Sequence, residues 1–467
     1  MFRSIWTTLG NCFKIPELKS RILFTILLLA VCRLTAFIVI PGINGHLLAE
    51  YLNRNGQGGL LVMYNTFAGG AYGNCAVGAL GIMPYISATI IIQLLTAVLP
   101  RLSKLVREEG GRTKIVQYGR YLTVILCILQ GVYFAHGWLT PQSVFGSTFQ
   151  GQLVMLQNHL AVYYIVTVTI MTAGTMLLMW LGEQITDRGI GNGVSLVITI
   201  GILARLPNAL QGAVDMFSTH GGNSEALHNF WTTAPVLVVL MIIVVGGVIA
   251  ITQAQRKVPV QYASRMIGQK MYQGGTNYMP LRVNYSGVMP IIFAQSILMF
   301  PGPLFQNLAT WTNSPSLAFL HRGCFWAAQQ FSYGSFIYLA IYALMILFFS
   351  YFWVATQFNE IQIADDLKKN GGYIPGVRPG QGTSDFLHNA MSRITLAGAV
   401  FLTIIATIPI ILSRKMGIDQ NVASFFGGTS ILIAVGVLLD TMRQVEAHLM
   451  MRHYDGFLKK GRIRGRF

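Results

Sequence analysis

The sequence predicts an all-α membrane protein of about ten transmembrane helices, arranged as two five-helix halves of inverted topology. Three observations support this fold class. First, 53% of the 467 residues are hydrophobic and only 10% are charged, whereas soluble domains carry about 25% charged residues. Second, apolar runs of about 20 residues, the length of helix that crosses the hydrocarbon core, recur along the chain. Third, a short sequence echo relates the two halves.

The predicted spans follow the apolar runs in chain order. They lie near residues 22–40, 76–99, 117–137, 159–181, 190–206, 232–252, 287–306, 335–356, 393–412 and 424–442. The first run continues to Pro41 without a small-residue cleavage pattern. We therefore expect it to stay as a span and not to be removed as a signal peptide.

These runs divide the chain into five segments. We expect a cytosolic amphipathic N-terminus (1–21), an N-terminal half with spans one to five (22–206), an external loop (207–231), a C-terminal half with spans six to ten (232–442) and a basic cytosolic tail (443–467). Two long basic loops, 253–285 and 357–390, belong to the C-terminal half.

The distribution of basic residues sets the predicted orientation. Of the 33 Lys and Arg residues, 27 fall on the side of the N-terminus, five fall on the opposite side or its edge, and Arg33 lies within the first span. Cytosolic loops collect Lys and Arg, so both termini are predicted to be cytosolic. The same rule explains most of the net charge of +17. An acidic partner, such as nucleic acid, a ribosome or an anionic lipid surface, is the second explanation, and the two can hold together.

The sequence echo consists of two hexapeptides that open predicted spans. Gly-Ile-Met-Pro-Tyr-Ile at 81–86 opens span two, and Gly-Val-Met-Pro-Ile-Ile at 287–292 opens span seven. Five spans separate the two openings, so the two helices run in opposite directions. Corresponding elements of opposite direction are typical of an inverted repeat.

The chemistry of the common enzyme classes is absent from the sequence. HExxH, GxSxG and a Walker-type phosphate loop do not occur. The five cysteines form no CxxC pair, which favours neither a zinc site nor a disulfide framework. We therefore predict a protein that is not an enzyme and that has no cofactor and no metal site.

The predicted spans also contain almost no Asp or Glu. Transporters driven by protons or sodium usually place carboxylates there, because ion and proton relays need them. An ion-coupled secondary transporter with inverted repeats remains the alternative, since ten spans and Gly/Pro-interrupted segments also describe that class.

Several longer motifs resemble the SecY family of protein-translocation channels. They are Gly-Ile-Met-Pro-Tyr-Ile-Ser-Ala at 81–88 with Ile-Ile-Gln-Leu-Leu at 91–95, Trp-Leu-Gly-Glu-Gln-Ile-Thr-Asp-Arg-Gly-Ile-Gly-Asn-Gly at 180–193, Gly-Val-Arg-Pro-Gly at 376–380, and Phe-Gly-Gly-Thr-Ser at 426–430. The resemblance implies two halves around a central hourglass pore. It also implies the function: this pore would carry unfolded secretory polypeptides across the cytoplasmic (inner) membrane of a bacterium and insert membrane segments laterally into lipid.

By the same resemblance, six aliphatic side chains form a ring in the pore. They are Ile82, Ile86, Val194, Ile198, Ile292 and Ile433. The spacing agrees in kind, because Ile82/Ile86 and Val194/Ile198 are i, i+4 pairs that each present one helix face to a common axis. Such side chains offer no hydrogen bonds to water or ions, so the ring closes by dewetting. Val194 stands where the family more often has isoleucine, which predicts a slightly wider ring.

Residues 60–75 correspond to the plug of the family, a short half-helix that folds back to block the external funnel. The candidate plug residues are Asn65, Thr66, Phe67, Gly69 and Gly70. The segment is half apolar, rich in glycine and too short to span. Each glycine weakens a helix by about 1 kcal/mol relative to alanine, so we expect this half-helix to move aside easily. An ordinary external loop is the alternative.

Spans two and seven would form the lateral gate of the channel. Modest polar groups lie on them at Ser87, Thr89, Gln93, Gln295 and Ser296. Interhelical hydrogen bonds of this kind average about 0.6 kcal/mol, which holds a gate and still lets it open.

The resemblance also implies partners. The basic loops would dock the SecA motor ATPase and the ribosome through Arg256, Lys257, Arg265, Lys270 and Arg378. The other implied partners are SecE-like and SecG-like small membrane subunits, unfolded signal-bearing polypeptides and membrane lipids. Topology alone explains most of the loop charge. It does not explain Arg378, which Gly376 and Pro379-Gly380 place in a rigid, turn-rich setting.

Overall fold

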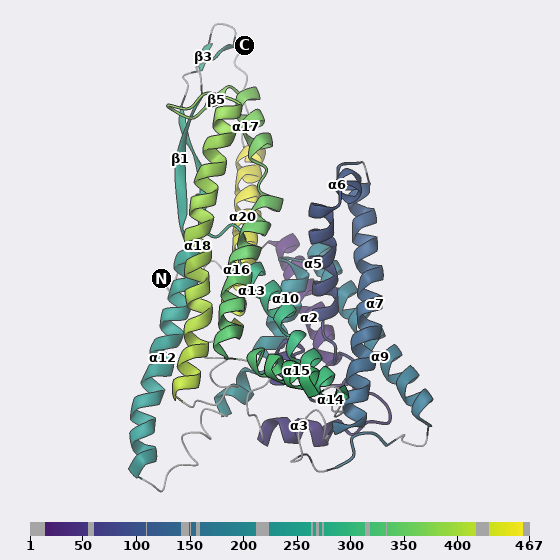
Figure 1. Ribbon diagram of the computed structural model, residues 1–467. Helices are drawn as coiled ribbons and strands as arrows, with labels where there is room; N and C mark the ends of the chain where they lie inside the picture. The colour runs from purple at the N-terminus through teal and green to yellow at the C-terminus, as the bar shows by residue number, and fades with distance from the viewer. Residues whose placement is uncertain are drawn as a thin grey trace. The chain divides into compact units, whose positions relative to one another are not determined.

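The computed structural model describes residues 15–54, 60–108, 110–141, 149, 151–155, 159–211, 224–262, 265–267, 270–272, 275–312, 318–332, 334–416 and 429–460. These residues are mostly helical and divide into two compact units (Figure 1). Unit 1 contains the described residues from 15 to 211 and residues 437–460. Unit 2 contains those from 224 to 416 and residues 429–436.

Unit 1 is built from helices. They are α2 (Pro16–Leu34), α3 (Gly45–Arg54), α4 (Leu60–Phe67), α5 (Met83–Val98), α6 (Pro100–Arg107), α7 (Gly111–Leu139), α9 (Leu160–Arg188), α10 (Gly193–Leu203) and, from residue 437 on, α20 (Thr429–Lys460). The long helix α7 packs against α5 and α9, and α9 packs against α10 and α2. The chain turns by 104° between α5 and α6, because Pro100 disfavours a helical conformation at the preceding Leu99.

Unit 2 combines helices with short strands. Its helices are α12 (Ser224–Gln253), α13 (Met289–Leu298), α14 (Pro301–Trp311), α15 (Ala318–Gln330), α16 (Phe336–Gln357), α17 (Glu360–Lys369), α18 (Gln381–Met416) and the first residues of α20. Its strands are β1 (Gln255–Tyr262), β2 (Arg265–Ile267), β3 (Lys270–Tyr272), β4 (Thr276–Arg282) and β5 (Gly372–Tyr373). Helix α16 packs between α13 and α18, and Figure 1 shows α16 and α18 side by side.

The predicted loops 253–285 and 357–390 fold together into a structured part of unit 2, and the second holds three Lys/Arg against four Asp/Glu, which corrects its description as basic. Strand β1 pairs antiparallel with β4 along its length and with β5 at its end, which gives the strand order β4-β1-β5. Val258 and Val260 alternate with exposed residues along β1, so one face of this sheet is covered and the other is open. The sequence predicts only helices and loops here, and the strands correct that expectation.

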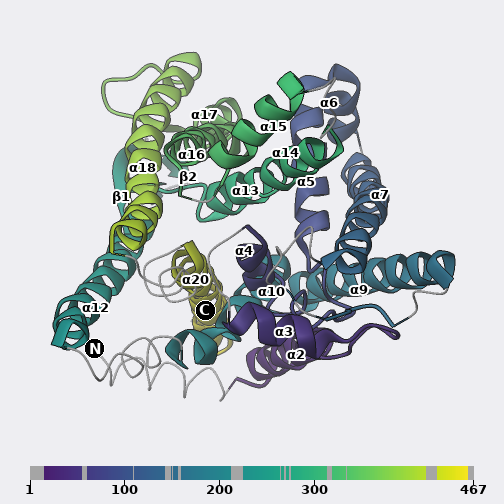
Figure 2. The same ribbon diagram turned by 60° about the horizontal axis from the view of Figure 1, so that its bottom comes forward.

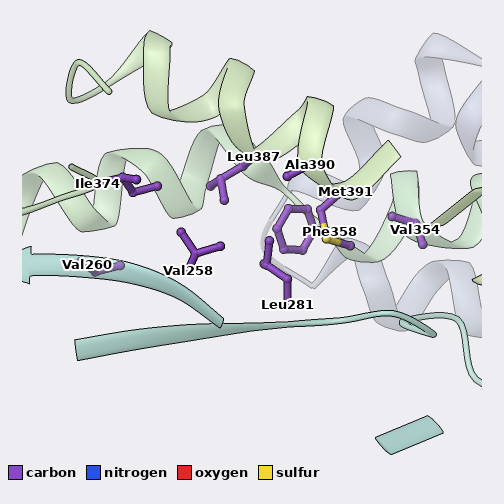
Figure 3. Close-up of a cluster of buried hydrophobic side chains, with 9 residues drawn as sticks. All are labelled: Val258, Val260, Leu281, Val354, Phe358, Ile374, Leu387, Ala390 and Met391. Carbon is purple, nitrogen blue, oxygen red and sulfur yellow. The ribbon is translucent and has the colours of Figure 1, made fainter. Parts of the chain in front are cut away.

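An apolar core holds this sheet against the neighbouring helices. Figure 3 shows the buried side chains of the strands facing those of α18. The cluster contains Val258, Val260, Leu281, Val354, Phe358, Ile374, Leu387, Ala390 and Met391. We call β1, β4, β5, α17 and the adjoining ends of α16 and α18 the sheet module. It joins residues about a hundred positions apart in the sequence.

Seven of the described helices are long and apolar enough to cross a membrane, or eight if the bent pair α5–α6 is one span. The chain is therefore a multi-pass membrane protein. The predicted first and tenth spans coincide in part with α2 and α20, which carry several charged residues, among them Glu17, Lys19 and Arg21 in α2. The count of ten stays a prediction. The predicted span 22–40 is helical only to Leu34, after which Val39 bridges to Ala76.

Candidate functional site

The two echo hexapeptides adopt the same backbone conformation. Gly81 and Gly287 have φ angles of +58° and +63°, which L residues with a side chain rarely adopt. The residues that follow, Ile82 and Val288, have φ/ψ of −95°/1° and −96°/−2°. A proline then lies in the first helical turn of α5 and of α13, where its missing N–H leaves no helical hydrogen bond unmade. The echo is thus a shared structural device, a left-handed glycine that starts a helix.

The predicted ring residues lie at the starts of helices. Ile82 immediately precedes α5, and its carbonyl accepts a hydrogen bond from the Ile86 amide, 3.2 Å away. Val194 and Ile198 lie in the first turns of α10. These four residues belong to unit 1, and all of them except the half-buried Val194 are buried.

The other two ring candidates belong to unit 2. Ile292 in α13 and Ile433 in α20 are both buried. Ile292 occupies the same position after its hexapeptide glycine as Ile86 does in unit 1. The echo therefore relates two ring candidates to each other by position. That the six side chains form one ring stays a prediction.

The predicted plug segment begins with the short helix α4, which lies beside α10 in Figure 2. The helix ends at Phe67, so Gly69 and Gly70 follow the helix instead of lying within it. Their φ angles are +64° and +88°. This corrects the expectation that the glycines weaken a half-helix, because they form the left-handed turn that ends it.

Hydrogen bonds within residues 60–75, and contacts of this segment with Leu80 and Phe134, fix the conformation of the turn. The Gly73 amide donates to Oδ1 of Asn65 at 2.9 Å, and the Gly70 amide donates to the Asn65 carbonyl at 2.8 Å. The Tyr64 hydroxyl donates to the Leu80 carbonyl at 2.8 Å. The rings of Tyr64 and Tyr72 both contact Phe134 of α7, with centroids 4.9 and 5.0 Å away. The segment is thus an ordered element of unit 1.

Two arginines from neighbouring elements reach the end of α4. Nη1 of Arg33, in the last turn of α2, donates to the Gly69 carbonyl at 2.8 Å, and its guanidinium also lies over the Phe37 ring. Nη1 of Arg205, just after α10, donates to the Thr66 hydroxyl at 3.2 Å. In the sequence, Arg33 lies within the first predicted span and Arg205 near the end of the fifth, and nothing there connects either charge to residues 60–75. An isolated arginine inside an apolar run was the available signal.

Three of the predicted gate residues form side-chain hydrogen bonds within their own unit. The Thr89 hydroxyl donates to the Tyr85 carbonyl of α5, and the Ser296 hydroxyl donates to the Ile292 carbonyl of α13. Nε2 of Gln295 donates to the Thr429 hydroxyl of α20 at 2.8 Å, and both residues are buried. Ser87 and Gln93 are half-buried on α5. A role of these groups between α5 and α13 stays a prediction.

The predicted partner residues lie on the sheet module, on the separate strand pair β2–β3 and on the turn between β5 and α18. Arg256 and Lys257 are exposed on β1, and Arg265 and Lys270 lie in the two strands β2 and β3, which pair with each other. Arg378 is exposed on the turn between β5 and α18.

Arg378 is held from both sides. The Val377 amide donates to the carbonyl of the core residue Ile374 at 3.1 Å, and the Thr383 hydroxyl donates to the Arg378 carbonyl at 3.0 Å. Gly376 and Gly380 have φ angles of +82° and +92°. In the described part of the chain, Arg378 has no ion-pair partner. A buried core therefore fixes the backbone of a free cationic side chain, a geometry suited to an acidic or carbonyl-bearing partner.

Comparison with known proteins places these features in a family. The sequence model of the SecY family matches residues 76–442. The chain is 43% identical over 465 residues to the protein translocase subunit SecY of Chlamydia muridarum, covering 98% of this chain and 99% of that one. It is 39% identical over 467 residues to the protein translocase subunit SecY of Thermotoga maritima, covering 99% of this chain and 100% of that one.

Solved structures show the same fold. A structure described as a protein conducting channel has a TM-score of 0.59 at 19% identity, covering 94% of this chain and 96% of that chain. Sec61 in the canine ribosome-channel complex from the endoplasmic reticulum has a TM-score of 0.55 at 18% identity and the same coverage. By sequence and by fold, this chain belongs to the SecY family.

Proposed function

We propose that this chain is the pore-forming subunit of a protein-conducting channel in the cytoplasmic membrane of a bacterium. It moves unfolded secretory polypeptides across the membrane and inserts membrane segments laterally into lipid. The observation that carries the proposal is the identity of 39–43% with protein translocase subunits over nearly the whole chain. The secondary-transporter alternative has no comparable support.

The pore ring would supply the seal of the open channel. Ile82, Ile86, Val194, Ile198, Ile292 and Ile433 are branched aliphatic residues, which make no directional contacts with a passing chain. A polypeptide can therefore slide through without breaking specific bonds, while ions find no hydrogen-bonding groups. Five of them lie at the starts of α5, α10 and α13, which supports this role because helices hold side chains more rigidly than loops do.

The segment 60–75 would be the plug that closes the resting channel. It is a short helix with an ordered turn, held by contacts at its end. An isolated helix of eight residues is far too short to be stable by itself, so its position depends on those contacts. Loss of the two arginine contacts would weaken the hold on the element, which the packing of Tyr64 and Tyr72 on Phe134 also supports.

The helices α5 and α13 would form the lateral gate, in the two halves that the echo relates. The shared left-handed glycine at the start of each helix supports the proposal of an inverted repeat. Gln295 would contribute through its bond to Thr429, which sets how α13 lies on α20.

The sheet module would be the docking surface for SecA and for the ribosome, with both termini on the same, cytosolic side. Arg378 is the central contact, since its turn is rigid and its guanidinium is exposed. The chain would contribute no catalysis. Energy would come from the motor ATPase or from chain elongation, and SecE-like and SecG-like subunits would complete the channel.

The test is transport of an unfolded secretory precursor into proteoliposomes that hold this chain, its small partner subunits and the motor with ATP. The proposal expects the precursor to become protected from external protease only when it carries a signal sequence. If no precursor enters while the same vesicles take up an ion or a small solute, the transporter alternative replaces it.

A further inference from the structure

We propose that Arg33 and Arg205 act together as a clamp that keeps the plug in its closed position. This inference rests on the proposed role of residues 60–75 and assigns the residues that position them. Both arginines belong to unit 1, as does the plug segment, so their contacts lie within one compact unit.

The two guanidinium groups meet the same end of α4. Arg33 donates to the carbonyl of Gly69, in the turn that ends the helix, and Arg205 donates to the side chain of Thr66, in its last turn. The last carbonyls of a helix carry partial negative charge and attract cations. In the described part of the chain, neither arginine forms an ion pair. Among the described residues, their side chains donate hydrogen bonds to the plug segment.

Close packing makes this contact specific to the seated plug. A Cβ atom at Gly69 would lie 2.6 Å from Nη1 of Arg33 and 2.9 Å from the Cα atom of Gly201 in α10. A Cβ atom at Gly201 would in turn lie 3.3 Å from the Phe67 carbonyl oxygen. The backbone of the plug turn thus lies directly against α10, with the guanidinium of Arg33 beside it.

The helix that precedes Arg205 is itself anchored at its other end. The amides of Ile190, Gly191 and Gly193 donate to the side chains of Thr25 in α2, Gln444 in α20 and Thr186 in α9, at 3.1, 2.9 and 2.9 Å. Three neighbouring helices therefore fix the start of α10. A helix held at its start keeps Arg205 at a defined place, which is what a clamp needs.

Opening would break both hydrogen bonds in one step. A guanidinium among apolar helices has few other acceptors, so each arginine loses a strong charge-assisted bond when the plug leaves. Because the lost acceptors are carbonyl and hydroxyl groups and not carboxylates, the clamp can release without separating an ion pair. The structure thus assigns a holding role to two charges that topology alone would not place here.

The experiment measures ion conductance of the purified channel complex in planar bilayers without a precursor. Arg33→Met and Arg205→Met remove the donors and keep an unbranched side chain. We expect each to raise the resting conductance about tenfold, since each removes one charge-assisted hydrogen bond. Thr66→Val removes the acceptor of Arg205 with little change of shape. It should match Arg205→Met and add nothing to it in the double variant.

Two controls distinguish a failure of the clamp proposal from a failure of the plug assignment. Arg322→Met changes an exposed arginine of α15 and should leave the conductance at the wild-type level. Deletion of residues 60–75 should raise conductance at least as much as the double variant Arg33→Met/Arg205→Met. If the deletion leaks and the arginine and Thr66 variants stay tight, the clamp is wrong and the plug stands. If the deletion stays tight, the plug assignment falls and the clamp with it. Co-purification of the partner subunits verifies that each variant is assembled.

Discussion

The plug segment and the sheet module differ in what holds them in place. The proposed plug, residues 60–75, contains an eight-residue helix whose end contacts two arginine side chains and a glycine turn, and its Tyr64 and Tyr72 pack on Phe134. The sheet module is held by nine buried apolar residues from strands and helices, while its arginines point outward. Charged groups thus secure the first element and are displayed by the second.

This difference suits two kinds of work. Only a few hydrogen bonds must break to free a small element, so the element can leave and return. Burial of apolar surface contributes about 25 cal/mol per Å² across the whole core, and the core is lost only by unfolding. The plug is therefore expected to move as a unit, whereas the sheet module is expected to keep its shape when a partner binds.

The largest expected effect comes from reversing the displayed charge. Arg378→Glu should abolish motor-driven transport, because charge reversal at a docking contact costs about 2–5 kcal/mol or more in binding. Its backbone contacts stay, so the complex should remain folded and the motor should fail to engage it. Precursor protection in proteoliposomes measures the effect. Arg322→Glu makes the same change on α15, outside the sheet module, and should retain most transport; normal export by Arg378→Glu would refute the assignment.

The next effect should appear in the core of the sheet module. Leu387 is 0% exposed within this cluster, so Leu387→Ala should lower the free energy of unfolding of the module by about 2–5 kcal/mol. Ile361 on α17 is 65% exposed, and Ile361→Ala should change stability by less than about 0.5 kcal/mol. Pulse proteolysis of the complex over a urea series compares them. Equal losses would mean that the apolar core is not what holds the module.

Two adjacent glycines sharpen the account of the plug. Gly69→Ala and Gly70→Ala each put a side chain on a left-handed residue, a strain of about 1–2 kcal/mol. Only the Cβ at position 69 would also meet Arg33 and Gly201, since nothing lies within 4 Å of a Cβ at Gly70. The resting ion conductance of Gly69→Ala should therefore be well above that of Gly70→Ala. Equal conductance would show that the close packing around Gly69 does not hold the plug.

The smallest effect is expected at the gate. Thr429→Val removes the acceptor of Gln295 and should shift gate opening by about 0.6 kcal/mol, roughly threefold. Ser296→Ala removes a hydroxyl that donates to the Ile292 carbonyl of its own helix and should shift gate opening less than Thr429→Val does. Transport of a precursor with a weakened signal sequence reports the shift. A larger effect of Ser296→Ala than of Thr429→Val would reverse this assignment.

Much of the helical architecture could be predicted, because apolar runs of span length carry a strong signal. The sheet module could not, since β1 pairs with β5 more than a hundred residues away and prolines at 259 and 280 obscure the strand pattern. The arginine contacts also could not be predicted from the sequence, because a hydrogen bond such as that from Arg33 to Gly69 depends on tertiary proximity.

The echo shows where sequence and structure agree most closely. Gly81 and Gly287 occupy matching positions in the two hexapeptides. Their similar positive φ angles explain why both positions are glycine. The helix end at Phe67 shows the opposite case, because propensity arguments placed the plug glycines inside a helix that stops before them. The glycine-rich, half-apolar composition of residues 60–75 sets this segment apart from a transmembrane span. It does not indicate which contacts hold the segment in place.

The most direct test of the channel itself is site-specific crosslinking of a precursor stalled in transit. A photo-reactive residue is placed in turn at Ile86, Ile198, Ile292 and Ile433, and for comparison at Ile125 and Leu129, which are exposed on α7. The account predicts crosslinks from all four ring positions, dependent on the motor and ATP, and none from α7. Efficient transport with crosslinks absent from the ring, or equal at α7, would contradict it.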